Sequence, residues 1–153
     1  MLKVGNRAPS FTLENTDHQK TSLKDFLGQK VVLYFYPKDL TSGCTKQAVA
    51  FSEMIAQVEE LNAVILGVSK DSIERHQKFI EKFDLKITLL SDVDGKICEK
   101  YDVWKEKSMY GKKYMGIERT TFVINEEGKI SHIFPKVKVT NHAQAVLLAL
   151  KEK

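Results

Sequence analysis

The run VVLYFY, residues 31–36, constrains the fold of this chain more than any other segment. Its β-branched and aromatic residues follow one another without a charged position, a pattern typical of a strand that is buried on both faces of a sheet. Pro37 comes next and cannot donate a ladder hydrogen bond, so it marks the end of the strand. We expect this strand to lie in the centre of the sheet.

Other apolar runs predict the remaining strands, at residues 63–69, 87–91, 120–124 and 129–134. The turn NEEG separates the last two runs, which indicates a β-hairpin. Short strands are also expected around FTL and KTSL, near the N-terminus.

Helical patterns separate these runs. Apolar side chains recur every three or four residues over 48–58, 73–83 and 143–150, and a short helix is expected at GKICEKY. Alternating strands and helices followed by a hairpin imply an α/β fold with a central mixed β-sheet flanked by helices on both faces. No Pro-rich or Gly-rich linker divides residues 1–153, so we expect a single domain.

Composition argues against several classes of protein. Apolar residues make up 42% and charged residues 29% of the chain, the balance of an ordinary globular protein. The net charge of +4 is spread along the sequence, so we expect no nucleic-acid partner. The apolar runs are too short to span a bilayer, and MLKVGNRAPSF lacks the apolar core of a signal peptide. We therefore expect a cytoplasmic protein without a membrane partner.

The histidines and cysteines do not predict a metal site or a disulfide framework. The four histidines are scattered, and the two cysteines, Cys44 and Cys98, form no CxxC motif. This usage fits a reducing compartment, in which a thiol is kept for packing or for chemistry. His76 lies on an apolar helical stripe, which favours a histidine at the edge of the core over a catalytic one. Trp104, Tyr110 and Tyr114 have two possible roles, as packing under a loop or as the wall of a site, and their spacing does not choose between them.

Cys44 lies where the loop KDLTSG gives way to a predicted helix. In the first turn of a helix, unpaired N–H groups and the helix dipole favour an anion, so a reactive thiolate is one interpretation. The other is a small apolar residue packed at a helix start, because free cysteines are often buried. Thr41 adds a hydroxyl, Gly43 permits close approach of the backbone, and Pro37 stiffens the end of the strand. The amides of residues 43 and 44 could stabilise developing negative charge.

The segment PKDLTSGC resembles the active-site pattern Pro-x-x-x-Thr/Ser-x-x-Cys of the peroxiredoxins, thiol peroxidases of thioredoxin-like fold. Within them the chain is similar to the Q-type branch, the bacterioferritin comigratory proteins. The resemblance runs through VGNRAPSFTL, KVVLYFYPKDLTSGCTKQA, LLSDVDGKICEKYDVW, GIERTTFVINEEGKI and NHAQAVLLALK.

This resemblance implies reduction of hydrogen peroxide or an organic hydroperoxide by the Cys44 thiolate, which becomes a sulfenic acid. Thr41 would orient the peroxide and Pro37 would shield the sulfenate. Arg119, in GIERTTF, matches the active-site arginine of the family, and its cation would favour the thiolate. Gln47 would hold that arginine or lie on the surface. No metal and no organic cofactor is implied.

The chain departs from the family pattern at two positions. Ser42 replaces a common proline before the Gly-Cys pair, which makes the loop more mobile. Val49 occupies the position, five residues after Cys44, at which many Q-type members carry a resolving cysteine. Cys98 is then the possible intramolecular resolving residue, or it packs a short helix. The favoured interpretation is a one-cysteine cycle in a monomer, resolved by an external thiol such as thioredoxin, glutaredoxin or glutathione.

Two rival functions remain to be separated. A general disulfide oxidoreductase is disfavoured because exchange needs a second thiol at short reach. A non-catalytic redox sensor or holdase would react with peroxide about stoichiometrically, whereas a peroxidase would turn over with a thiol donor.

Overall fold

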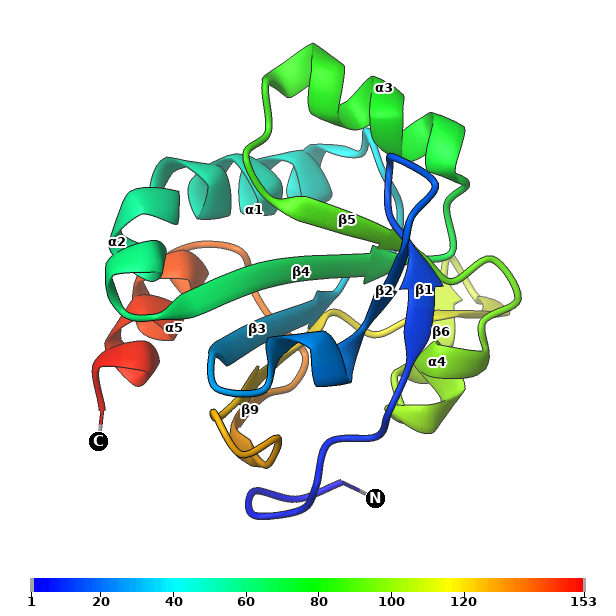
Figure 1. The fold of residues 1–153 in the computed structure, drawn as a ribbon. Helices are drawn as coiled ribbons and strands as arrows, with labels where there is room; N and C mark the ends of the chain where they lie inside the picture. Colours follow the sequence, from blue (N-terminus) through cyan, green and yellow to red (C-terminus); the bar gives the residue numbers. More distant parts are fainter. Residues whose placement is uncertain (1, 153) are drawn as a thin grey trace.

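The computed structural model describes residues 2–152 and contains a seven-stranded sheet of order β2-β1-β5-β4-β3-β8-β9 (Figure 1). The strands are β1 (Thr12–Glu14), β2 (Lys20–Ser22), β3 (Lys30–Phe35), β4 (Ala63–Ser69), β5 (Thr88–Ser91), β8 (Thr120–Ile124) and β9 (Ile130–Phe134). β3 pairs in parallel with β4, and β4 with β5, whereas β8 runs antiparallel to both β3 and β9. The predicted mixed sheet and hairpin are confirmed, with the run at 31–36 in a central strand.

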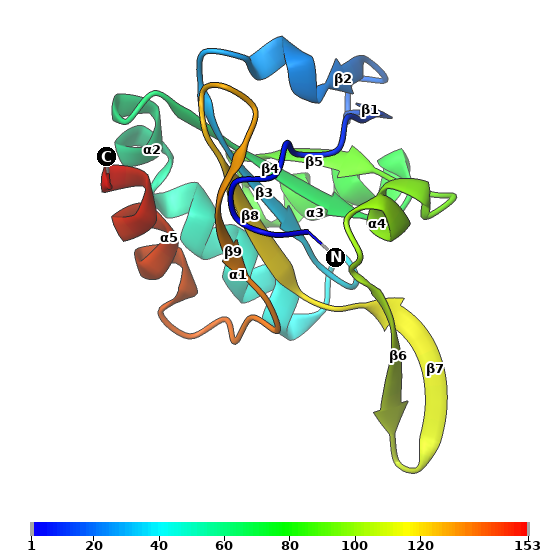
Figure 2. The ribbon, with the colours of Figure 1, turned by 90° about the horizontal axis from the view of Figure 1, so that it is seen from below.

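Helices cover both faces of the sheet, as predicted (Figure 2). The first face carries α1 (Ser42–Glu53), α2 (Ile55–Glu60), α3 (Ile73–Phe83) and α5 (His142–Lys151), and the second carries α4 (Lys96–Lys100) and the 3-10 helix η1 (Leu23–Phe26). β3 supplies both cores because its side chains alternate. Val32 and Tyr34 point to the first core, and Val31 and Leu33 to the second.

Several element boundaries differ from the prediction, and two of the differences lie on either side of Cys44. β3 ends at Phe35, and the continuous helix expected after Cys44 is divided into α1 and α2 at Met54. Met54 has φ −104° and ψ 12°, and its N–H bonds to Phe51 at 3.2 Å in a tightened last turn. The apolar periodicity continues through this break because both helices pack on the same core.

A two-stranded hairpin projects from the main body and was not predicted (Figure 2). It pairs β6 (Trp104–Met109) with β7 (Lys112–Ile117). Tyr110 and Gly111 turn the chain with φ values of 52° and 77°, the signature of a two-residue turn with both central residues left-handed. Tyrosine rarely adopts that conformation, so the usual Asn-Gly signal is missing from the sequence.

Within residues 2–152, no helix has the length and apolar character needed to cross a membrane.

Candidate active site

Cys44 is the third residue of α1 and lies in its first turn, as the sequence predicted. Thr41 is the N-cap residue in an extended conformation, and its carbonyl accepts from the Thr45 N–H at 2.9 Å. The side chain of Cys44 is only 2% exposed and belongs to the first core. The sulfur therefore lies at the positive end of a helix dipole, in surroundings that contain little water.

Arg119 approaches Cys44 from the segment between β7 and β8. Its Nη2 lies 3.3 Å from Cys44 Sγ, and its Nη1 donates to Gln47 Oε1 at 2.6 Å. Gln47 is itself 2% exposed, so it does not lie on the surface but beside Arg119, the first of the two positions expected for it. A Cβ at Gly43 would lie 3.3 Å from Arg119 Nη2, so a side chain there would crowd the guanidinium. The guanidinium of Arg119 thus contacts both the Cys44 thiol and the side-chain amide of Gln47.

A second cation, Lys107 of β6, lies near this site. Burial, followed by repulsion from Arg119, lowers the pKa of Lys107, while Cys44 and Glu118 oppose that change. The unpredicted hairpin therefore contributes to the electrostatics around the thiol. No spacing in the sequence could indicate this, because the hairpin itself was not recognised.

The loop that joins β3 to α1 carries the other predicted residues. Pro37 is half-buried, and the exposed Thr41 donates its hydroxyl to the Lys38 carbonyl at 2.8 Å. Since the Thr41 oxygen is used as a donor, its lone pairs remain able to accept a hydrogen bond from a ligand.

Cys98 lies on the other side of the molecule's central sheet. It belongs to the second core, whereas Cys44 belongs to the first. Cys98 is 0% exposed, its N–H donates to Asp92 Oδ2 at 2.8 Å, and burial raises the pKa of its thiol far above the usual range. The structure brings Cys44, Gln47, Gly43 and Arg119 together and leaves Cys98 apart from them.

The three aromatic residues left open by the sequence have different places. Trp104 packs against the second core, with Lys70 Nζ 4.2 Å from its ring centroid. Tyr110 is 96% exposed at the tip of the hairpin, and Tyr114 is exposed on β7. His76 is fully buried, and its Nδ1 is hydrogen-bonded to Asp39. No pattern in the sequence had indicated a role for Asp39.

A thiol at a helix N-terminus, paired with a guanidinium and mounted on a thioredoxin-like sheet, defines a thiol-dependent peroxidase. Residues 4–133 match the AhpC/TSA family, and the chain belongs to that family as a peroxiredoxin.

Relatives and solved structures agree with this assignment. The chain is 51% identical to a putative peroxiredoxin Bcp of Coxiella burnetii, over 95% of this chain and 97% of that protein. It is 46% identical to peroxiredoxin Bcp of Bacillus subtilis, over 99% and 96%. A mutant of Xylella fastidiosa PrxQ has a similar structure, with a TM-score of 0.94 and 37% identity over 99% of this chain and 96% of that one. The predicted thioredoxin-like fold and the resemblance to the Q-type branch are confirmed.

Proposed function

We propose that Cys44 is the nucleophile of this peroxidase. The observation that carries the proposal is the contact between Arg119 Nη2 and Cys44 Sγ at 3.3 Å, at the N-terminus of α1. The guanidinium and the N-terminus of α1 both place positive charge beside the sulfur, where it stabilises the negative charge that moves during attack on the peroxide. The substrate class is hydrogen peroxide and organic hydroperoxides. The Xanthomonas campestris bacterioferritin comigratory protein, 42% identical, is described as having alkyl peroxide reduction activity.

The remaining residues of the loop take complementary roles. The Cys44 thiolate attacks one peroxide oxygen, an S–O bond forms as the O–O bond breaks, and the leaving oxygen takes a proton from solvent to become water or an alcohol. Arg119 donates to the oxygens while negative charge moves between them. Thr41, whose hydroxyl already donates to the Lys38 carbonyl, accepts a hydrogen bond from the O–H group of the bound peroxide. Pro37 shields the sulfenate from water and from a second peroxide.

Resolution proceeds through an external thiol. Cys98 is buried in the opposite core and its raised pKa disfavours the thiolate needed for attack. An external thiol condenses with the Cys44 sulfenic acid, releasing water and forming a mixed disulfide, which a second thiol reduces. Thioredoxin, glutaredoxin and glutathione are the candidate donors, and the working unit is a monomeric single-domain chain in the cytoplasm. Sedimentation across a concentration series tests the monomer.

Peroxide consumption tests the nucleophile. The Cys44→Ser variant, given hydrogen peroxide and dithiothreitol, should lose turnover because the attacking sulfur is absent. Cys98→Ser is the matched control and should retain turnover. Consumption by Cys44→Ser at the wild-type rate would contradict the assignment, and a single stoichiometric reaction in the wild type would instead indicate a sensor.

Intact-mass analysis tests the one-cysteine cycle. After one equivalent of hydrogen peroxide, a sulfenic-acid trap should label both the wild type and Cys98→Ser at Cys44. Loss of two hydrogens in the wild type, with a trapped sulfenate only in Cys98→Ser, would make Cys98 the resolving residue.

A further inference from the structure

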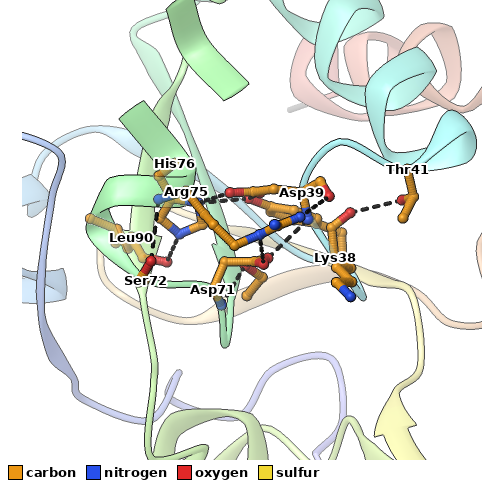
Figure 3. Close-up of polar contacts among 10 residues, drawn as sticks. Lys38, Asp39, Thr41, Asp71, Ser72, Arg75, His76 and Leu90 are labelled. Atoms are coloured by element: carbon orange, nitrogen blue, oxygen red, sulfur yellow. Dashed lines mark hydrogen bonds and ion pairs between the residues drawn. The ribbon is translucent and has the colours of Figure 1, made fainter. Parts of the chain in front are cut away.

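The loop between β3 and α1 is held by hydrogen bonds to α3 and to the segment that joins β4 to α3 (Figure 3). Asp39, in the middle of this loop, is 0% exposed, and each of its polar atoms has a protein partner. Its N–H donates to Asp71 Oδ2 at 2.9 Å, and its carbonyl accepts from Arg75 Nη2 at 3.0 Å. Its carboxylate contacts Tyr36 Oη and His76 Nδ1, both at 2.5 Å.

The donors around Asp39 are fixed by the hydrogen bonds on their far sides. His76 Nε2 lies 3.1 Å from the Leu90 carbonyl, which can only accept, so Nε2 carries a proton. At 2.5 Å, the Nδ1 of His76 and the Oδ2 of Asp39 have one proton between them, because two acceptors without a proton would repel each other. Burial raises the pKa of Tyr36 well above its usual range, so its hydroxyl is a donor to Asp39. A buried pair of this kind fixes the position of the chain that carries it.

A second layer of contacts holds the first. Arg75 Nε donates to Asp71 Oδ1 at 3.0 Å, and Ser69 Oγ donates to Asp71 Oδ2 at 2.6 Å. Side chains of β4 and α3 thus orient the Asp71 carboxylate, which in turn accepts a hydrogen bond from the Asp39 N–H of the loop. We call Asp39, Asp71, Arg75 and His76 the loop clamp.

The clamp opposes a strained backbone. Leu40, next to Asp39, has φ +68°, a conformation that costs a side chain with a Cβ free energy. One residue later Thr41 caps α1, and Cys44 follows in the first turn. Release of the clamp would let Leu40 relax and would displace Thr41 and the start of α1 together.

The two steps of the proposed cycle make opposite demands on this loop. Reaction with peroxide needs Thr41, Cys44 and Arg119 in their present arrangement. Reaction of the sulfenic acid with an external thiol needs that thiol to reach a sulfur which is 2% exposed. The loop must therefore be held for the first step and opened for the second.

We propose that the loop clamp consists of positioning residues that hold the Cys44 loop for the peroxide step and thereby limit the step with the external thiol. This inference rests on the proposed role of Cys44. Weakening the clamp should slow sulfenic-acid formation and speed its reduction, a pair of opposite changes that a general loss of stability does not produce.

Asp39→Ala tests the proposal, with Asp92→Ala as its matched control. Asp92 is equally buried at 1% exposure, but it accepts from the N–H groups of Ile97 and Cys98 and so holds α4. Rapid quench and intact-mass analysis measure sulfenic-acid formation with hydrogen peroxide and its reduction by dithiothreitol. We expect Asp39→Ala to slow formation at least about tenfold and to speed reduction several-fold. Asp92→Ala should change neither rate constant by more than about twofold.

Two further variants keep the test decisive if Asp39→Ala does not fold. Asp39→Asn can still accept from Tyr36 and donate to His76, so it should restore much of the formation rate. Arg75→Ala removes a partly exposed side chain, whose exposure is 41%, and should fold while changing both rate constants about threefold in opposite directions.

The outcomes separate this inference from the proposed function. Unchanged rate constants in Arg75→Ala, and in Asp39→Ala where that variant folds, would overturn the clamp alone, because the peroxide reaction at Cys44 would persist without it. Equal slowing of both steps would also overturn it. Wild-type turnover in Cys44→Ser would overturn the proposed function itself.

Discussion

At the scale of the residue, the guanidinium of Arg119 makes two side-chain contacts at once. It reaches Gln47 Oε1 and Cys44 Sγ from two different nitrogens. Arg119→Lys keeps the charge, but one ammonium group cannot reproduce the fork. We expect sulfenic-acid formation to slow at least about tenfold in Arg119→Lys and about a hundredfold in Arg119→Ala. A competition assay for hydrogen peroxide measures both, and a wild-type rate in Arg119→Lys would show that charge alone is sufficient.

Substitution of Gly43 should lower the activity of this site without lowering the stability of the fold. Gly43→Ala should stabilise the fold by up to about 1 kcal/mol, since alanine is the better helix former. Its Cβ would lie 3.3 Å from Arg119 Nη2, so the guanidinium must move by a few tenths of an ångström. We expect sulfenic-acid formation to slow several-fold while the midpoint of thermal unfolding stays equal or rises. A slower reaction together with a lower midpoint would point to misfolding of α1 and contradict this explanation.

At the scale of the element, sequence reasoning recovered what local pattern determines. The runs at 63–69 and 120–124 are strands at the predicted residues, and Cys44 lies in the first turn of a helix. The hairpin of residues 104–117 was missed because its tight turn uses tyrosine in a left-handed conformation. The contact between Arg119 and Cys44 joins distant parts of the chain, and only the resemblance to a family indicated it. The apolar stripe placed His76 at the edge of the core, but its contact with Asp39 had no local signal, because the two residues lie 37 positions apart in the chain.

His142, the first residue of α5, links the docking of this helix to pH. It packs against Phe51 and Phe134, and its Nε2 lies 2.8 Å from Thr121 Oγ1. Burial, followed by the charge of Arg119, lowers its pKa from 6.5 to about 4. Above pH 6.5 neither state binds the proton. Between pH 6.5 and 4 the unfolded chain binds it and the folded protein does not, so stability falls as pH falls.

We therefore expect the free energy of unfolding to decrease by roughly 1 to 2 kcal/mol from pH 7 to pH 5 through His142. Urea unfolding of the wild type and of His142→Gln at both pH values measures this. The variant should be less stable at pH 7 but should lose less stability on acidification. Parallel losses in both proteins would remove His142 as the cause.

At the scale of the whole molecule, the sheet separates two cores that each bury groups able to ionise at alkaline pH. Tyr34 and Tyr36 lie in the first core, and Cys98 and Tyr101 lie in the second. Burial raises the pKa of all four above its usual value. Each group keeps its proton in the folded protein at a pH at which the unfolded chain has lost it. The stability that these groups contribute is therefore complete below pH 9 and is lost as pH rises further.

Cys98 makes this prediction specific, because its thiol ionises first in the unfolded chain, near its usual pKa of 9.0. In a Cys44→Ser background, which avoids oxidation at Cys44, unfolding by urea should become easier from pH 8 to pH 10. Adding Cys98→Ala creates a small cavity that lowers stability at every pH, but it should reduce the alkaline loss by about 1 kcal/mol at pH 10. The difference between the two slopes isolates the thiol from the cavity. Identical slopes would mean that Cys98 ionises as readily in the folded protein as in the unfolded chain, and would reopen the possibility that it attacks a sulfenic acid.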